Sequence, residues 1–206
     1  MGSVFDPSAQ HDDVDARIVA ALERLSQVFR VRLGEEARQR NLSPIQAQFL
    51  IYLLHHDVEL RRVSQLAREF DLTQATVSDA VASLETKGLL RREQWPEDRR
   101  VVTLRLTLEG EKLATSLSNW AEPIREHLER FSFGEREAVM SFLMELVGSL
   151  QRSGLITVAR MCVTCRFFRR DVRPGQALPH HCGLLDVPLG GSNLRVDCPE
   201  HEAIVG

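Results

Sequence analysis

Four cysteines are the residues best suited to chemistry in this chain, and all of them lie in its last quarter. Two residues separate the first pair, and the third and fourth cysteines follow after gaps of sixteen and fifteen residues. They are Cys162, Cys165, Cys182 and Cys198. Clustered thiolates bind zinc or iron–sulfur clusters. The sequence therefore predicts one metal centre in the C-terminal segment, with these four residues as its ligands.

Three chemical outcomes are open for the cysteines. Structural zinc sites often use two close ligand pairs, whereas here only Cys162 and Cys165 are close in sequence. One close pair and two single cysteines suit the separate corners of a cubane, so the spacing favours a 4Fe-4S over a 2Fe-2S cluster, with one Zn2+ as the alternative. Two disulfides are the third outcome. They are disfavoured because the polar, acidic N-terminus lacks a signal peptide and predicts a cytoplasmic protein, in which thiols stay reduced.

Residues beside the cysteines could shape such a centre. Phe167 and Phe168 are candidates to shield a cluster from water, or to form a small hydrophobic plug. Nearby arginines could offset thiolate charge or lie on a solvated surface: Arg166, Arg169 and Arg170. Three histidines could replace a cysteine as ligand, but we expect them to lie around the site or to be merely exposed, because four cysteines complete it: His180, His181 and His201.

Length, composition and charge exclude several classes of protein. A chain of 206 residues with 43% hydrophobic residues is long enough for one ordinary domain plus a small appendage. Its net charge of −3 argues against a polybasic binder, although a local basic face is sufficient for DNA binding. No stretch is apolar enough to cross a bilayer, so we expect no membrane partner. The chain carries no phosphate loop, dinucleotide fingerprint or nucleophile elbow, which predicts that it is not an enzyme.

The elements before the cysteines are mostly helical. Apolar residues at three- and four-residue steps predict an amphipathic helix over 12–33. Ser43 and Pro44 predict the start of a second helix that ends near residue 56. A helix over 63–70 and a longer one that Thr73 caps and Gly88 ends form a helix-turn-helix pattern.

The residues after Gly88 change to the two-residue period of strands. Segments 89–94 and 101–106 around a charged tip predict a β-hairpin, or wing. Thr107 then caps a helix that runs to about residue 131 with a kink at Pro123, and a last helix covers 139–150.

This order of elements resembles the multiple-antibiotic-resistance regulator (MarR) family. The segments that carry the resemblance are LSPIQAQFLIYLL, VSQLAREFDLTQATVSDAVASLETKGLLRRE and WPEDRRVVTLRLTLEGEKL. The resemblance implies a homodimer built from the terminal helices and an arginine of the wing tip, Arg99 or Arg100, in the DNA minor groove. A two-fold dimer places two recognition helices about one DNA turn apart.

Candidate DNA contacts lie at the start of the second helix of the motif and on the wing. Small hydrogen-bonding residues suit base edges and phosphates in the major groove: Thr73, Gln74, Thr76 and Ser78. Arginines suit phosphates or a narrow minor groove: Arg91, Arg92, Arg99 and Arg100. We expect Asp98 to orient these arginines. Asp79 stands where many relatives carry a basic residue, which leaves the base preference open.

The cysteine-containing tail has a resemblance of its own. The segments CVTCRFF, HHCGLL and VDCPEH are similar to the cluster-binding region of high-potential iron–sulfur proteins. That similarity implies a 4Fe-4S cluster.

Together these patterns predict a mostly α fold, a winged helix-turn-helix with terminal dimerisation helices and a small irregular Cys-rich C-terminal segment. The predicted boundaries are a disordered N-terminus over 1–11, a MarR-like domain over 12–153 and the cysteine segment over 154–206. The predicted function is a sequence-specific repressor that binds pseudo-palindromic double-stranded DNA, modulated by an iron–sulfur cluster. The alternative is a regulator that senses a small-molecule ligand and uses zinc only as a structural staple.

Overall fold

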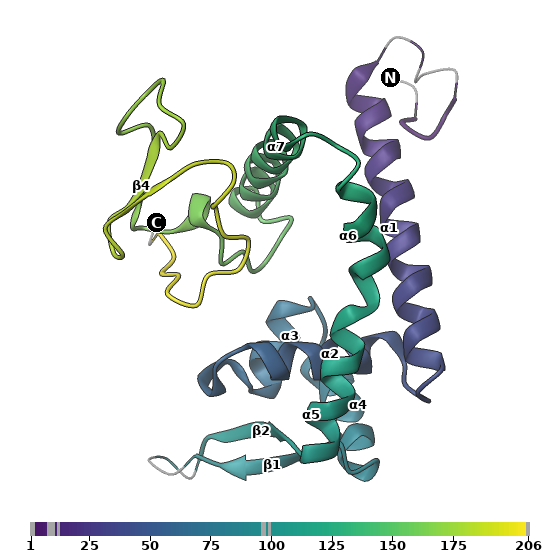
Figure 1. Cartoon of the computed structure of the whole chain (residues 1–206). Helices are drawn as coiled ribbons and strands as arrows, with labels where there is room; N and C mark the ends of the chain where they lie inside the picture. The colour runs from purple at the N-terminus through teal and green to yellow at the C-terminus, as the bar shows by residue number, and fades with distance from the viewer. Residues whose placement is uncertain (1–2, 8–10, 12, 96–97, 99, 205–206) are drawn as a thin grey trace. The chain divides into compact units, whose positions relative to one another are not determined.

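The computed structural model describes residues 3–7, 11, 13–95, 98 and 100–204. Helices make up most of the described chain as far as residue 152 (Figure 1). The helices are α1 (Val14–Arg38), α2 (Pro44–His55), α3 (Val63–Glu69), α4 (Gln74–Thr86), α5 (Leu108–Leu117), α6 (Glu122–Leu128) and α7 (Phe133–Arg152). Short 3-10 turns are η1 (Val58–Leu60), η2 (Ser118–Ala121) and η3 (Cys162–Thr164). The strands are β1 (Leu90–Gln94), β2 (Val102–Leu106), β3 (Phe168–Arg169), β4 (His180–Cys182) and β5 (Val187–Leu189). No helix in the described part of the chain is long and apolar enough to span a membrane.

The chain divides into two compact units that interleave in sequence. The first unit contains Met1–His55, Ala80–Glu93 and Leu104–Ile124. The second contains His56–Asp79, Gln94–Thr103 and Arg125–Gly206.

The core of the first unit forms around α2, which packs against α1 and α5. This helix is apolar on most sides, and Phe49, Leu50 and Leu53 are fully buried in it. Phe29 of α1 and Trp120 of η2 add an edge-to-face pair with ring centroids 5.9 Å apart. The side chains of α2 therefore hold together the helices from which the first unit is built.

Three predicted helix starts are confirmed by their capping bonds. The Ser43 hydroxyl accepts from the Gln46 main-chain N–H at 3.3 Å at the start of α2. The Thr73 hydroxyl accepts from the N–H of Thr76 at 3.1 Å at the start of α4. Thr107 caps α5 in the same way, through the N–H of Gly110 at 3.0 Å. Each cap provides a partner for a main-chain donor that the first turn of a helix leaves unpaired.

Some helix limits differ from those that the periodicity predicts. Helix α1 continues to Arg38, because Leu33, Gly34 and Ala37 are buried and extend its packed face. The long helix predicted after Thr107 is interrupted by η2 before Pro123, which lies in the first turn of α6, where proline is tolerated. The last helix starts earlier than predicted, at Phe133, through a capping box between Ser132 and Glu135.

The C-terminal segment is more regular than expected. Its strands form an antiparallel sheet in the order β3-β4-β5, with Phe168 opposite Cys182 and Cys182 opposite Val187. The prediction of an irregular segment was wrong on this point. Strands of two or three residues are too short to give a readable alternation of apolar and polar side chains.

Helix α7 and the cysteine segment share one hydrophobic core. Met144 of α7 packs with Met161, Val163 and Leu189, and all four side chains are buried. A Cβ at Gly148 would lie 3.1 Å from Val163, so the glycine permits the close approach of η3 to the helix. Helix α7 thus forms the base on which the cysteine segment folds.

Candidate functional site

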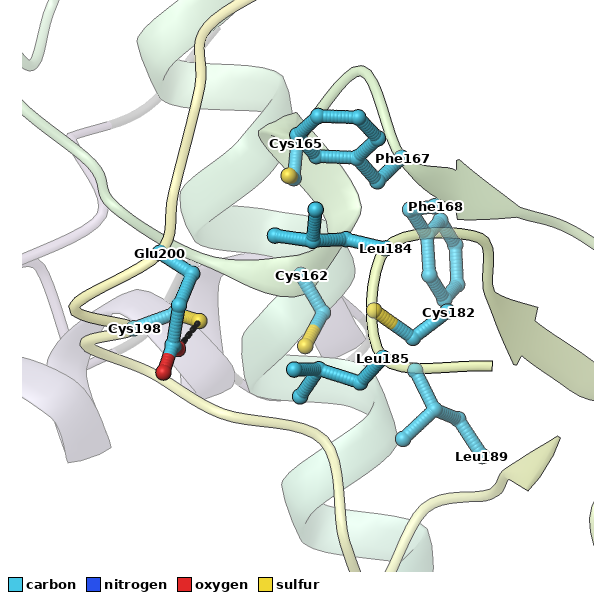
Figure 2. A pocket seen from close by; sticks show the side chains of 10 residues that line it. All are labelled: Cys162, Cys165, Phe167, Phe168, Cys182, Leu184, Leu185, Leu189, Cys198 and Glu200. Atoms are coloured by element: carbon cyan, nitrogen blue, oxygen red, sulfur yellow. Dashed lines mark hydrogen bonds between the residues drawn. The ribbon is translucent and has the colours of Figure 1, made fainter. Parts of the chain in front are cut away.

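The four cysteines, which span 37 residues of the sequence, line a single pocket in the second unit (Figure 2). Cys162 begins η3, Cys165 follows it, Cys182 ends β4 and Cys198 lies in the C-terminal loop. All four are free thiols. The structure therefore brings the predicted ligand set together at one place.

Main-chain hydrogen bonds position the cysteines. The N–H of Cys165 donates to the carbonyl of Cys162 at 3.0 Å, which closes the turn between them. The Thr164 hydroxyl braces this turn by donating to the carbonyl of Ala159 at 2.6 Å. The N–H of Cys198 donates to the carbonyl of Arg160 at 2.8 Å, which ties the last cysteine to the segment before the first.

The wall of the pocket is largely apolar. It contains Phe167, Phe168, Leu184, Leu185 and Leu189 beside the four cysteines, and Glu200 is the charged residue among those that line it. Both phenylalanines thus lie in the wall of the pocket, where they could shield a cluster or serve as a hydrophobic plug. An apolar wall limits the access of water to any group held by the thiols.

The environment of Cys162 and Cys198 raises the pKa of both thiols and so favours their protonated form. Burial raises the pKa of Cys162, an effect that the Arg195 main-chain N–H opposes and that the neighbouring Cys182 and Cys165 reinforce. Burial and the hydrogen bond to Glu200 raise the pKa of Cys198. A metal that binds here must displace these protons, so its binding is pH-dependent.

Arg195 is a site residue that the sequence analysis missed. Its main-chain N–H donates to Cys162 Sγ at 3.2 Å, and its Nη1 approaches Cys198 Sγ at 3.6 Å. The same Nη1 donates to Glu200 Oε2 at 2.8 Å, and Cys198 Sγ donates to that oxygen at 3.3 Å. Arg195 therefore provides positive charge and a directed N–H to two of the four sulfurs. Its spacing, three residues before Cys198, was the only signal available.

Two of the three arginines suggested as charge partners pair with carboxylates instead. Arg166 pairs with Glu202 at 2.7 Å, and Arg170 pairs with Glu145 at the same distance. Arg169 lies against Gly183, whose added Cβ would be 3.1 Å from the arginine Nε. None of these three arginines lines the pocket among the described residues.

The histidines considered as replacement ligands also have other partners. His180 Nδ1 accepts from the N–H of Asp171 at 3.1 Å. His181 lies 3.0 Å from Asp186, and His201 lies 3.0 Å from the Thr164 hydroxyl. In the described part of the chain, no three histidine, cysteine, aspartate or glutamate side chains are grouped around a position for one metal ion. The four sulfurs surround a pocket rather than a point.

The predicted major-groove residues lie at the start of α4 in the second unit. Thr73, Gln74 and Thr76 are exposed, Ser78 is partly buried, and Asp79 is exposed one residue further on. The hydroxyls of Thr73 and Thr76 lie 2.9 Å apart, so one of them donates to the other. Of these three exposed side chains, that of Gln74 is therefore the most available to bond to a base edge.

The wing residues differ in their availability. Arg91 pairs with Glu93 at 2.6 Å, and Arg92 lies 3.8 Å from Glu85. Exposed pairs of this kind are weak and can exchange a carboxylate for a phosphate. Arg100 is exposed. Its main-chain N–H, rather than its guanidinium, donates to Asp98 Oδ1 at 2.9 Å. Arg99, the other candidate for the wing tip, lies outside the described residues.

Comparisons with known proteins agree with this arrangement of helices and wing. Residues 40–101 match the family model described as the MarR family. The uncharacterized HTH-type transcriptional regulator YdgJ of Bacillus subtilis is 31% identical over 98 residues, which are 47% of this chain and 59% of that protein. The transcriptional regulator HosA of Escherichia coli is 33% identical over 78 residues, 37% of this chain and 58% of HosA. The chain thus spans about three-fifths of the length of these relatives, which are regulators rather than enzymes.

Solved structures extend the match over the helices. The MepR–DNA complex of S. aureus has a TM-score of 0.55 and 25% identity, and the match covers 64% of this chain and 96% of MepR. MepR in its DNA-binding conformation has a TM-score of 0.58 at 24% identity and shares the fold.

Proposed function

Because residues 40–101 match the MarR family model, we propose that this chain is a DNA-binding transcriptional repressor whose operator affinity depends on an iron–sulfur cluster in the cysteine pocket. The observation that carries the proposal is the convergence of all four cysteines on one pocket in a chain with this motif. The partners are double-stranded DNA with a pseudo-palindromic operator and a second copy of the chain.

The DNA-binding part is supported by the exposed start of α4. Thr73, Gln74 and Thr76 present hydroxyl and amide groups to solvent at the N-terminus of the helix that would enter the groove. An amide side chain can pair with adenine through two bonds, and hydroxyls can bond to bases or phosphates. The exposed Arg100 supplies a cation for phosphates or the minor groove.

The dimer is supported by apolar side chains that a single chain leaves exposed. Helix α1 exposes 41% to 56% of five of its large apolar side chains: Val19, Leu25, Val28, Phe29 and Val31. Exposed apolar side chains in this number are typical of a helix that packs against a partner. A two-fold protein dimer would also match the two-fold symmetry of a pseudo-palindromic operator.

The cluster is supported by the shape and chemistry of the pocket. Zinc would need the four sulfurs about 2.3 Å from one point, whereas a cubane takes one thiolate at each of four separate irons. Four sulfurs that line one apolar pocket are compatible with the second requirement. Arg195 would offset the negative charge of the thiolates through its N–H and guanidinium donors. A bound cluster would supply one-electron redox chemistry and sensitivity to oxidants.

The proposal is tested on anaerobically purified protein. Iron, sulfide and zinc are measured, and affinity is determined for duplex DNA that the protein itself selects from a random library. We expect a brown protein with about four irons and four sulfides per chain, and at least tenfold different affinity after the iron is removed by a chelator.

Matched variants separate the site from its surroundings. Cys182→Ser should lose the iron, whereas Glu202→Gln, an exposed change in the same segment, should keep both the iron and the affinity. A colourless protein that holds one zinc per chain, and whose operator affinity does not change when the zinc is removed, would instead support the small-molecule sensor with a structural zinc.

A further inference from the structure

We propose that Arg160 transmits the occupancy of the cysteine pocket to the helix-turn-helix, through Glu69 at the end of α3. This inference rests on the proposed function, because it assigns the route by which the same pocket would regulate DNA binding. All the residues involved belong to the second unit. We call Arg160, Asp197, Glu69 and His56 the Arg160 cluster.

The guanidinium of Arg160 joins two carboxylates from distant parts of the chain. Its Nη1 donates to Glu69 Oε2 at 2.9 Å, and its Nε donates to Asp197 Oδ1 at 2.8 Å. Only 12% of the Arg160 side chain is exposed, whereas 54% of the side chain of Arg166, a surface arginine, is exposed. Charge-assisted bonds with this little water around them are stronger and more directional than surface pairs.

His56 adds a third point of contact. Its Nε2 lies 2.7 Å from Asp197 Oδ2 and 3.0 Å from Arg160 Nη2. His56 directly follows α2 and precedes η1, so the cluster holds the C-terminal loop against both ends of the segment 56–69.

The other side of the cluster is continuous with the cysteine pocket. Asp197 directly precedes Cys198, and Arg160 lies two residues before Cys162. The carbonyl of Arg160 accepts from the N–H of Cys198 at 2.8 Å. A group bound by both Cys162 and Cys198 would therefore fix the two main-chain segments that orient the guanidinium and its carboxylate.

A short connection also joins the Arg160 cluster to the DNA-binding motif. Glu69 is the last residue of α3, and a tight turn connects it to α4. The N–H of Leu72 donates to the carbonyl of Ala67 at 2.9 Å, and Asp71 adopts a left-handed φ of 49°. Thr73 then caps α4. Because this turn is short and held by a main-chain hydrogen bond, a displacement of Glu69 would shift the start of the recognition helix.

Loss of the bound group would loosen the tail side of this connection. Cys198 and Asp197 would no longer be held by the ligand bond, and the Asp197 side chain is already 47% exposed. If Asp197 moves, Arg160 can keep its hydrogen bond to Glu69 or its hydrogen bond to Asp197, but it cannot keep both with their present geometry. A tenfold change in operator affinity corresponds to about 1.4 kcal/mol, which one such rearrangement can supply.

The test compares operator affinity for iron-loaded and chelator-stripped protein in three full-length chains. The wild type should change at least tenfold. Glu69→Gln removes the carboxylate on the DNA side without touching the pocket, and should keep the iron content and visible spectrum while the affinity ratio falls to about one. Glu59→Gln makes the same chemical change at an exposed position of η1 in the same unit, and should keep the wild-type ratio. Using the ratio cancels any direct effect of the lost charge on DNA.

Two results would overturn the inference, and they are distinguishable. If Glu69→Gln retains the iron and the full wild-type ratio, the Arg160 cluster is structural only, and the proposed function stands. If the wild type holds no cluster, or binds DNA equally with and without it, the proposed function fails and this inference fails with it. A melting curve unchanged from the wild type shows that Glu69→Gln remains folded, and Arg160→Gln should reproduce its ratio independently.

Discussion

Gly110, in the first turn of α5, lies directly against the main chain of Leu89 at the base of the wing. A Cβ at this position would be only 1.8 Å from the Leu89 carbonyl oxygen. The same oxygen accepts from the N–H of Thr107 at 3.1 Å, and the Thr107 hydroxyl donates to the carbonyl of Gly88 at 2.7 Å. The start of α5 is thereby fastened to the start of β1.

We expect Gly110→Ala to destabilise the protein strongly. The added carbon overlaps a main-chain atom rather than a flexible side chain, so the start of α5 must move away from β1, at a cost of about 3 kcal/mol or more. The measurement is the urea midpoint. Gly134→Ala is the control, because a Cβ there meets nothing within 4 Å, and it should be neutral or stabilising by up to about 1 kcal/mol. Equal midpoints for the two variants would contradict the close contact.

The capping box of α7 predicts a pH dependence. Hydrogen bonds from the Ser132 hydroxyl and main-chain N–H hold the pKa of Glu135 below its usual value. The carboxylate therefore stabilises the helix above the pKa of the unfolded chain, and this contribution is lost as the pH falls through the lower folded value. Titration of the Glu135 side chain by NMR should show the lowered pKa, and Ser132→Ala should return it toward normal.

The same substitution should also reduce stability at neutral pH. Loss of the Ser132 cap is expected to cost about 1 kcal/mol in chemical denaturation. Ser149→Ala, at an exposed position in the last turn of α7, should not cost stability because alanine has the higher helix propensity. If both variants lose the same stability, the capping box is not formed in solution.

The wing arginines should contribute to DNA binding without affecting assembly. We expect Arg99→Ala together with Arg100→Ala to weaken operator binding well over tenfold, because two cations would be lost from the phosphates or the minor groove. The slope of log affinity against log salt should become shallower by roughly 2. Arg130→Ala with Arg136→Ala removes the same charge from two exposed positions, one just before α7 and one within it, and should leave affinity unchanged. Unaltered binding by the wing variant in a gel-shift titration would exclude the wing from the interface.

The exposed face of α1 should be needed for the dimer. Leu25, 51% exposed, is expected to be covered by a second copy, so Leu25→Glu would place a charge in an apolar interface and shift the protein to monomers. Sedimentation at micromolar concentration measures this. Thr115→Glu, at an exposed position of α5, should remain dimeric. A dimeric Leu25→Glu variant would assign the interface to another surface.

The sequence predicted well those features that depend on neighbouring residues. Ser43, Thr73 and Thr107 signalled helix starts because a cap bonds to an N–H only three residues away. Gly88 signalled a helix end, and its φ of 70° is one that glycine adopts without strain. Limits set by packing were less predictable. Helix α1 continues past residue 33 because distant parts of the chain bury its last turns.

What the sequence determined by itself about the candidate site was the ligand type: four thiols in one tail, following a winged helix-turn-helix. The tertiary structure decided how they meet, since strand pairing opposite Cys182 and the bond from Cys198 to Arg160 close gaps of many residues. It also decided that Arg195 and Glu200 face the sulfurs, and that Arg160 joins Asp197 to Glu69. Contacts between residues so far apart depend on the packing of α7, η3 and the C-terminal loop, and no local pattern of residue types encodes that packing.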